Sequence, residues 1–187
     1  MPKQMLKTAL FLFIISSISG LLLALSEQIT APVIIAINEK FEMQARSQVL
    51  PQAKTFKTDK QLAIGYNDDG SIAGFVIGVK PKGYGAQINM LVGINNNGKI
   101  TGTKILSHSE TPGLGAKITG EEFHSKFMSV IEKNEKTDLR VKKDGGDVDA
   151  ITAATITSRA FCEGLKEAQK IFSENTLILN TSTGGKL

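Results

Sequence analysis

The sequence is poor in the residues that build metal and haem centres, since its 187 residues include one cysteine, two histidines and no tryptophan. One thiolate cannot hold a cysteine-rich zinc site or an iron–sulfur cluster, each of which takes about four thiolates, and it can form no disulfide within the chain. No C-x-x-C-H segment is present, which excludes covalent c-type haem. Any redox activity therefore depends on an organic cofactor, and we expect no metal site.

A strong excess of charge of one sign is also missing. The 22 Lys and Arg residues nearly match the 18 Asp and Glu residues, which leaves a formal net charge of +4. Nucleic acids are bound through clustered basic residues, so we expect no nucleic-acid partner. Mean hydropathy is −0.01, but this average combines an apolar N-terminal segment with a polar remainder.

The apolar segment runs from Thr8 to Ser26 and contains nineteen residues without a charge. At about 1.5 Å per residue, such a helix spans most of the roughly 30 Å hydrocarbon layer of a membrane. The alternative is a cleaved signal peptide, whose apolar region is usually only about 7–15 residues long. We predict an uncleaved transmembrane helix over residues 8–26. Because Lys3 and Lys7 precede it, residues 1–7 are expected in the cytoplasm and the remainder outside it, at the cell (inner) membrane.

The rest of the chain predicts one α+β domain with an antiparallel sheet and packed helices. Residues 27–60 are expected to form a stalk, with a helix beginning near Pro32. G-x-I-x-G units at 70–74 and 98–102 precede β-rich runs, and residues 88–94 and 100–106 are expected to form a hairpin. The domain is expected over residues 61–175 and a C-terminal tail over 176–187, with loose order already after Ser173.

Two helices are predicted in the second half of this domain. Thr119-Gly-Glu-Glu122 has the form of a capping box and precedes apolar residues at helical spacing. A second helix has an apolar stripe from Phe161 to Phe172. We expect Cys162 to be buried in this helix and His124 to be solvated on the first one.

The loop from Ser107 to Gly115, S-H-S-E-T-P-G-L-G, is a candidate ligand-binding segment. Its glycines allow the backbone to approach a ligand closely, and Pro112 stiffens it. An ordinary connecting loop is the alternative that its composition leaves open. His108 is not expected to bind a metal, because only one other histidine exists.

The segment from Asp149 to Ser158, D-A-I-T-A-A-T-I-T-S, holds four hydroxyl residues where a loop is predicted to become a helix. Free backbone N–H groups and the positive end of the helix dipole suit a phosphate there. Small side chains at Ala153 and Ala154 leave room for a bulky group at Thr155. A simple helix cap would explain one or two of the hydroxyls, and the residues alone leave both interpretations open.

This segment resembles the D-x-x-[ST]-G-A-T-x-[ST] flavinylation motif. The motif occurs in the G subunit of Rnf electron-transport complexes and in the C subunit of the related sodium-translocating NADH:quinone reductase. The segments GYGAQINMLVGI and GKITGTKILSHSETPGLGAKI precede it in the order of that family, so the resemblance covers nearly the whole chain. It implies an FMN phosphate esterified to Thr155, with Ala153 where the motif usually has glycine.

The resemblance also implies roles for neighbouring residues. Asp149 and Thr152 would serve recognition by the flavin transferase, and Thr157 and Ser158 would cap the helix or bind phosphate. The loop from His108 to Gly115 would shape the flavin pocket, with Leu114 against the ring. The expected cofactor-binding residues are Asp149, Thr152, Ala153, Ala154, Thr155, Thr157, Ser158, Glu110, Thr111, Gly113, Leu114 and Gly115.

The function that the resemblance implies is that of a membrane-anchored flavoprotein relaying electrons within an Rnf-type complex. Such a complex couples electron transfer between ferredoxin and NAD to ion movement. Expected partners are the other membrane and peripheral subunits, membrane lipid and the flavin transferase. Alone, the subunit would catalyse no complete reaction and would have no catalytic residue. The alternatives are an FMN-binding domain of another membrane redox or regulatory protein, and an anchored binding module without flavin.

Overall fold

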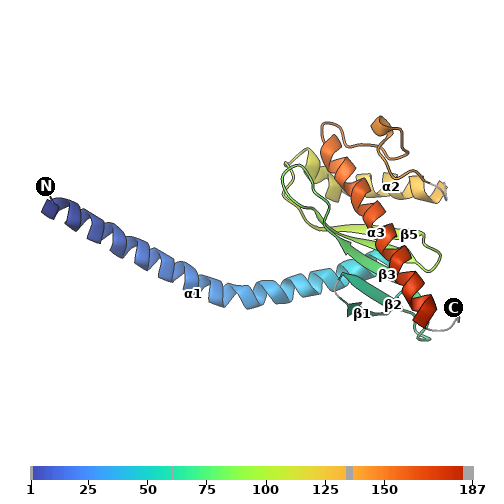
Figure 1. Ribbon diagram of the computed structural model, residues 1–187, viewed down its shortest axis with the longest axis horizontal. Coiled ribbons are helices and arrows are strands. Elements are labelled where there is room, and N and C mark those ends of the chain that lie inside the picture. Colours follow the sequence, from blue (N-terminus) through green and yellow to red (C-terminus); the bar gives the residue numbers. More distant parts are fainter. Residues whose placement is uncertain (1, 60, 134–136, 183–187) are drawn as a thin grey trace. The chain divides into compact units, whose positions relative to one another are not determined.

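The computed structural model describes residues 2–59, 61–133 and 137–182. The chain divides into two compact units, Met1–Met43 and Gln44–Leu187. Helix α1 (Pro2–Val49) forms the described part of the first unit, and its last residues belong to the second. The second unit combines an antiparallel sheet with helices, as Figure 1 shows, which confirms the predicted α+β class.

Helix α1 contains the predicted transmembrane segment. Among the described helices it alone is long and apolar enough to cross a membrane, and none of its most apolar stretch is buried within the protein. The expected helix start near Pro32 is wrong, because Pro32 lies inside α1. Once a helix is nucleated, each further residue adds a hydrogen bond, so one missing donor does not end it.

The sheet contains five antiparallel strands in chain order, coloured teal to yellow-green in Figure 1. Its fourth and fifth strands pair as the predicted hairpin, which is therefore confirmed. The turn between them is closed by the N–H of Gly98, which donates to the carbonyl of Asn95 at 2.9 Å. The strands are β1 (Thr55–Asp59), β2 (Leu62–Tyr66), β3 (Ile72–Val79), β4 (Asn89–Asn95) and β5 (Ile100–Ser107).

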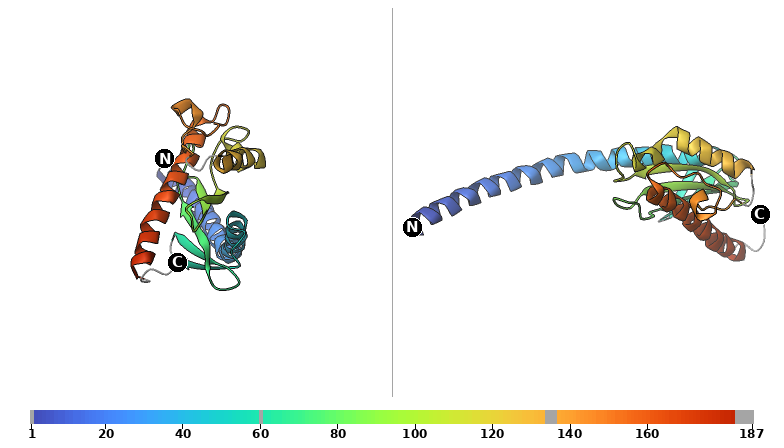
Figure 2. Two further views of the ribbon diagram at one scale, coloured as in Figure 1. Left: turned by 90° about the vertical axis from the view of Figure 1, so that its right-hand side faces the viewer. Right: turned by 90° about the horizontal axis from the view of Figure 1, so that it is seen from above.

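Both faces of this sheet are covered, which explains why the central strands β3 and β4 are buried along most of their length. One face packs on helix α3 (Thr155–Ser182), as Figure 2 shows. The side chains of Phe161 and Leu165 on this helix are fully buried. The other face packs on the end of α1, where Val49 and Leu50 are buried against Val76. The domain therefore has a core on each side of one sheet.

Two paired glycines let the end of α1 approach the sheet closely. Gly93 and Gly102 lie opposite each other on β4 and β5. A Cβ at Gly93 would collide with the carbonyl of Val49, and one at Gly102 would lie 3.0 Å from the Val49 Cα. The hydroxyl of Thr101 donates to that same Val49 carbonyl at 2.5 Å. Part of the glycine pattern that marked the strands therefore serves helix packing.

The predicted helix from Glu121 onwards is present as α2 (Glu121–Lys133), but the capping box is wrong. Thr119 is the last residue of the short helix η1 (Gly115–Thr119), and its hydroxyl donates to the carbonyl of Ala116 at 2.9 Å. Gly120 separates the two helices, so Thr119 is one residue too early to cap α2. Glu122 pairs instead with Lys126 at 2.6 Å.

Helix α3 continues to Ser182, so the loose order expected after Ser173 is wrong. Phe172 packs edge-on against Phe75 of the sheet, with ring centroids 5.4 Å apart. The side chains of Asn175 and Thr176 each donate to a backbone carbonyl four residues earlier, at 2.8 Å. This packing holds the helix onto the sheet well past its second turn. Residues 183–187 of the expected tail lie outside the described residues.

Cys162 and His124 test the remaining helix predictions. Cys162 is 3% exposed, as predicted, and burial raises the pKa of its thiol to about 11. His124 is half-buried rather than solvated, because its ring lies edge-on against Phe161 and its Nδ1 is 2.8 Å from the hydroxyl of Thr103. Burial, with the charge of Lys104, lowers the pKa of His124.

Candidate functional site

The predicted junction between loop and helix is present, because α3 begins at Thr155 directly after a tight turn. The turn is closed by the N–H of Ala154, which donates to the carbonyl of Ile151 at 2.9 Å. Within it, Ala153 has φ +62°, the only positive φ of a non-glycine residue in the described part of the chain. This conformation costs a residue with a Cβ about 1–2 kcal/mol. Glycine, usual here in the flavinylation motif, adopts it without that cost.

Ser158 holds this turn from the inside of the domain. Its side chain is fully buried. Its Oγ accepts the N–H of Ile151 at 2.9 Å and donates to the carbonyl of Ala154 at 3.0 Å. The hydroxyl of Ser158 is thus engaged by both ends of the turn that positions Thr155.

Glu110 connects three segments of the site. Its carboxylate accepts the N–H groups of Tyr84 at 2.9 Å and Gly85 at 3.2 Å, and also the hydroxyl of Thr157 in the first turn of α3. The N–H of Glu110 itself donates to Nδ1 of His108 at 3.1 Å. One buried side chain therefore joins the loop around Tyr84, its own loop and the start of α3.

Three glycines make room for this arrangement. A Cβ at Gly83 would collide with the carboxylate of Glu110, and one at Gly85 with the carbonyl of Ser109. A Cβ at Gly115 would lie 2.7 Å from both Oε2 of Glu110 and Oγ1 of Thr157. Close backbone approach to a ligand was expected for the glycines of the 107–115 loop; at Gly115, and likewise at Gly83, the group that approaches closely is the Glu110 side chain.

A cleft of about 470 Å³ opens between these segments, beside the start of α3. Thr155 is half-buried in its wall. Tyr84, Leu114 and Ile156 are 70%, 41% and 49% exposed, and among residues 44–176 no other large apolar side chain whose burial the structure describes is this exposed. All three line the cleft, together with Glu110, Thr111, Gly115, Ala153, Ala154, Thr155 and Thr157.

The structure thus brings eight of the expected cofactor-binding residues to one cleft, and it adds two that sequence reasoning missed. Tyr84 and Ile156 are the additions. The signal for Tyr84 was available, since an aromatic residue between Gly83 and Gly85 marks a loop with close backbone contacts. Ile156 is an apolar residue exposed at a helix start, and nothing in the sequence distinguishes it from a core residue.

The other expected residues lie elsewhere. Gly113 occupies the tip of its loop with φ +75°, and Ser158 is buried below the turn. Asp149 and Thr152 line a second cavity of about 360 Å³ between the 148–152 segment and α2. On the other side, residues of α2 and of the segment just before it line this cavity: Lys117, Gly120, Glu122, Phe123, Lys126, Phe127 and Val130.

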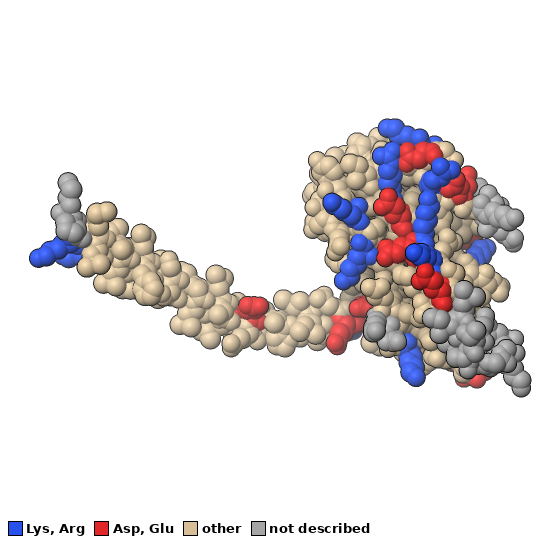
Figure 3. Space-filling view, in the orientation of Figure 1, with Lys and Arg blue, Asp and Glu red and all other residues tan. Residues whose placement is uncertain are grey.

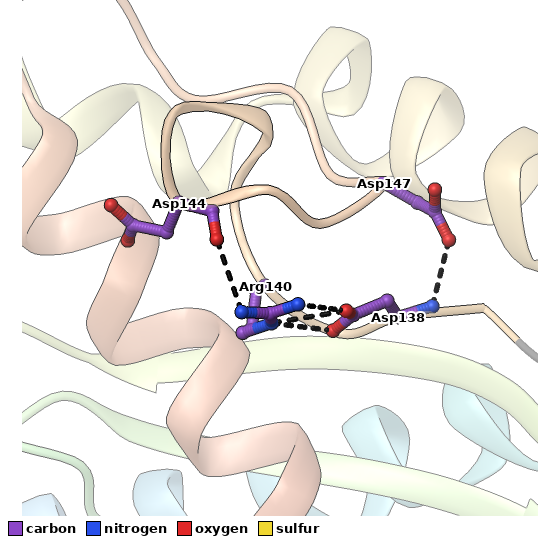
Figure 4. Close-up of polar contacts among 4 residues, drawn as sticks. All are labelled: Asp138, Arg140, Asp144 and Asp147. Atoms are coloured by element: carbon purple, nitrogen blue, oxygen red, sulfur yellow. Dashed lines mark hydrogen bonds and ion pairs between the residues drawn. The ribbon is translucent and has the colours of Figure 1, made fainter.

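A charged loop over residues 138–147 precedes the site, and Figure 4 shows the polar contacts within it. The Arg140 guanidinium donates to the carboxylate of Asp138 at 2.5 Å and to the carbonyl of Asp144 at 3.1 Å. The carboxylate of Asp147 accepts the N–H of Asp138 at 2.7 Å. Arg159 of α3 holds the Asp144 carboxylate with two bonds of 2.7 Å. Hydrogen bonds from the two arginines keep the pKa values of Asp138 and Asp144 below the ordinary range.

Charges of both signs are mixed over the face of the domain drawn in Figure 3. The exposed residues of α3 illustrate the mixture, since Glu163, Lys166, Glu167 and Lys170 follow one another within about two turns. Among the described residues, no group of three or more His, Cys, Asp or Glu side chains is placed to hold a metal ion.

Comparisons with known proteins agree with the site. The family model described as "FMN-binding domain" matches residues 83–170, which include the whole cleft. The G subunit of an ion-translocating oxidoreductase complex from Methanosarcina acetivorans is 31% identical over 89% of this chain and 93% of its own length. The G subunit of the Na(+)-translocating ferredoxin:NAD(+) oxidoreductase complex from Acetobacterium woodii is 30% identical over 91% of this chain and 92% of its own.

Among solved structures, NqrC of Shewanella oneidensis aligns with 62% of this chain and 64% of its own length, at 20% identity and a TM-score of 0.44. The similarity to the two G subunits spans nearly the full length of each chain, and the described part of this chain has one helix that is long and apolar enough to cross a membrane. The chain is therefore a membrane-anchored member of the family of G subunits of ion-translocating oxidoreductase complexes, with an FMN-binding domain.

Proposed function

We propose that this protein carries FMN as a phosphoester on Thr155 and relays electrons within an Rnf-type ferredoxin:NAD oxidoreductase complex. The observation that carries the proposal is the position of Thr155, at the first turn of α3 and in the wall of a cleft rimmed by exposed apolar side chains. FMN supplies the redox chemistry, and the protein supplies its position and electrostatic environment. The protein by itself completes no catalytic cycle.

The start of α3 suits the phosphate of such a linkage. The first N–H groups of a helix have no partner within the helix, and the helix dipole favours a negative charge there. A phosphodiester at Thr155 keeps one negative charge at this position. Because Ser158 and Glu110 fix the turn and the first turn of α3, the attachment point is held rigidly before the flavin arrives.

The rim of the cleft suits the ring. Exposed apolar side chains gathered at one place indicate a surface that a ligand or partner covers. The cleft volume of about 470 Å³ falls in the usual range for small-molecule sites. We assign Tyr84, Leu114 and Ile156 to the apolar contacts of the isoalloxazine ring, with Thr111 and Gly115 completing the wall.

The second cavity supports different roles for different residues of the motif, with flavin attachment at one position and recognition by the transferase at others. Asp149 and Thr152 line it, on segments that precede the turn with Ala153. We assign these two residues to recognition by the flavin transferase, because they are exposed and lie outside the cleft that would hold the ring. The carboxylate of Asp149 forms an ion pair with Lys142 at 2.8 Å, which fixes the position of the side chain that the transferase would recognise.

Mass spectrometry of the full chain, coexpressed with a flavin transferase, tests the attachment. We expect an adduct of FMN minus water that is lost completely in Thr155→Ala and retained in Thr119→Ala, a matched exposed threonine outside the cleft. No adduct on the wild type in the presence of the enzyme would contradict the proposal and leave an anchored module without flavin. Retention in Thr155→Ala with loss in Thr152→Ala or Thr157→Ala would move the attachment site.

The orientation in the membrane has its own test. Lys3 and Lys7 flank the apolar segment on its short side, and positive residues favour the cytoplasmic side of a membrane. We propose that the domain lies outside the cytoplasm, beside lipid and the other subunits of the complex. An alkaline phosphatase fused after Leu187 should be active and a cytoplasmic reporter at the same point inactive. The reverse pattern would refute this orientation.

A further inference from the structure

Glu110 is unusual among the charged residues of this protein. It is 5% exposed and is the only buried charged side chain among those that the structure describes. Removing a carboxylate from water is costly, so buried charges are usually paired with an opposite charge. The ion pairs of the described residues join other side chains, and none includes Glu110.

Hydrogen bonds, rather than a neighbouring cation, stabilise the carboxylate of Glu110. The N–H groups of Tyr84 and Gly85 both donate to Oε1, and the hydroxyl of Thr157 donates to Oε2. Three donors directed at two oxygens suit the ionised form of the side chain, which only accepts. These donors are neutral groups, so they stabilise the negative charge without cancelling it.

The position of this charge is also fixed. Gly83 and Gly115 pack so closely against the carboxylate that a Cβ at either would displace it. Glu110 lines the same cleft as Thr155, and its partner Thr157 follows Thr155 by two residues on α3. A charge held in a poorly hydrated wall acts more strongly on a neighbour than one in water. The cleft therefore has a buried carboxylate fixed in its wall.

We propose that Glu110 lowers the reduction potential of the flavin held at Thr155. The inference rests on the proposed function, since it concerns the cofactor assigned there. Reduction adds electrons to the isoalloxazine ring, and an unneutralised carboxylate in the cleft wall makes that addition less favourable. The flavin is thereby a stronger electron donor than it would be in a neutral cleft of the same shape.

The test compares neutral and charged versions of the site in the full chain, loaded with FMN by the transferase and purified in detergent. Glu110→Gln keeps the shape, because its amide oxygen accepts from Tyr84 and Gly85 and its NH₂ donates to Thr157. The matched control is Glu163→Gln, which removes an exposed carboxylate of α3. Spectroelectrochemical titration should show a positive shift of the midpoint potential in Glu110→Gln. The Glu163→Gln protein should match the wild type, because solvent screens exposed charges.

Glu110→Asp separates charge from packing, since it keeps the carboxylate but shortens the side chain. Its potential should stay near that of the wild type. A shift in Glu110→Asp as large as in Glu110→Gln would overturn the proposal, as would an unchanged potential in Glu110→Gln. If Glu110→Gln does not fold, the double variant Glu110→Met with Thr157→Val removes the same charge together with the hydroxyl that donates to it, so that only the N–H groups of Tyr84 and Gly85 lose their acceptor. The same positive shift is expected there, and its absence overturns the proposal.

The two proposals fail in different ways. A wild-type chain without an FMN adduct refutes the proposed function. A wild-type chain with the adduct, whose potential is the same in the neutral variants, refutes only the role of Glu110.

Discussion

Helix α1 and the cleft of the domain both expose large apolar side chains, and these two regions differ in how the exposure arises. Along α1, exposed residues such as Leu10, Phe13 and Ile29 succeed one another in a single helix. In the domain, Tyr84, Leu114 and Ile156 come from three segments far apart in the sequence and meet at one cleft. The first region is a continuous apolar surface, whereas the second is a small apolar rim beside a polar attachment point.

The comparison shows that exposed apolar surface can be removed from water in two ways, by membrane lipid or by a bound ligand. A helix that is apolar around its whole circumference is satisfied by hydrocarbon, which has no defined shape. An apolar rim around a cleft of limited volume is satisfied by a ligand that fits it. We therefore expect a charged substitution to be unfavourable at any position along the membrane-spanning part of α1. At the cleft, individual side chains should control how well the flavin is shielded.

The largest effect is expected from charge within α1. Ile15→Arg combined with Ile18→Arg places two guanidinium groups near the centre of the span, at a cost of about 2.5–3.5 kcal/mol each. We expect the chain to leave the membrane fraction, as measured by alkaline extraction and centrifugation. Thr119→Arg with Asn97→Arg adds the same charge to exposed positions of the domain and should leave membrane association intact. Unchanged membrane association of the Ile15/Ile18 variant would contradict the assignment of the span.

A smaller and different effect is expected at the cleft. Leu114→Ser removes one exposed side chain of the rim, so the stability of the flavin-free protein should change by less than about 0.5 kcal/mol. In the loaded protein the ring should become more accessible, which iodide quenching of flavin fluorescence measures. Ile29→Ser, at an exposed apolar position of α1, serves as the control and should leave the quenching unchanged. Equal quenching in both variants would show that Leu114 does not contact the ring.

The smallest effect concerns the turn beside the cleft. Ala153→Gly relieves the cost of φ +62°, offset in part by the greater freedom of glycine in the unfolded chain. We expect a gain of about 0.5–1 kcal/mol in the free energy of unfolding, measured by denaturant titration of the flavin-free protein in detergent. Ala154→Gly, a buried position without positive φ, should destabilise the protein instead. A loss of stability in Ala153→Gly would show that the turn carries no strain.

Local pattern was sufficient for several elements of the fold. The charge-free run from Thr8 to Ser26 predicted a helix, and the glycine-bracketed turns predicted the β4–β5 hairpin. These features depend on residues close together in the chain. The capping box failed because Thr119 joined η1 instead of α2, and a one-residue difference of this kind depends on how the two helices pack.

The residues of the candidate site also fall into those that local sequence pattern identified and those that it could not identify. The threonine segment and the loop with Glu110 were recognisable as motifs, and the resemblance gave Thr155 and Thr152 different roles, but only the structure places Thr155 in the cleft and Thr152 in the other cavity. Tyr84 and Ile156 were missed because their exposure follows from their surroundings in the folded domain. Likewise, the carboxylate of Glu110 acquires its partners from residues 26 and 47 positions away along the chain.

By itself, the amino-acid sequence determined an apolar span, too few cysteines and histidines for a metal or haem centre, and a cluster of threonines and alanines typical of flavin attachment. Side-chain type and spacing are properties of the chain, so they hold in any fold. Only the tertiary structure decided that Ala153 is strained, that Ser158 supports the turn, and that Glu110 places an unpaired charge in the cleft wall. Burial and strain arise when distant segments pack together, because only packing removes water and restricts the backbone.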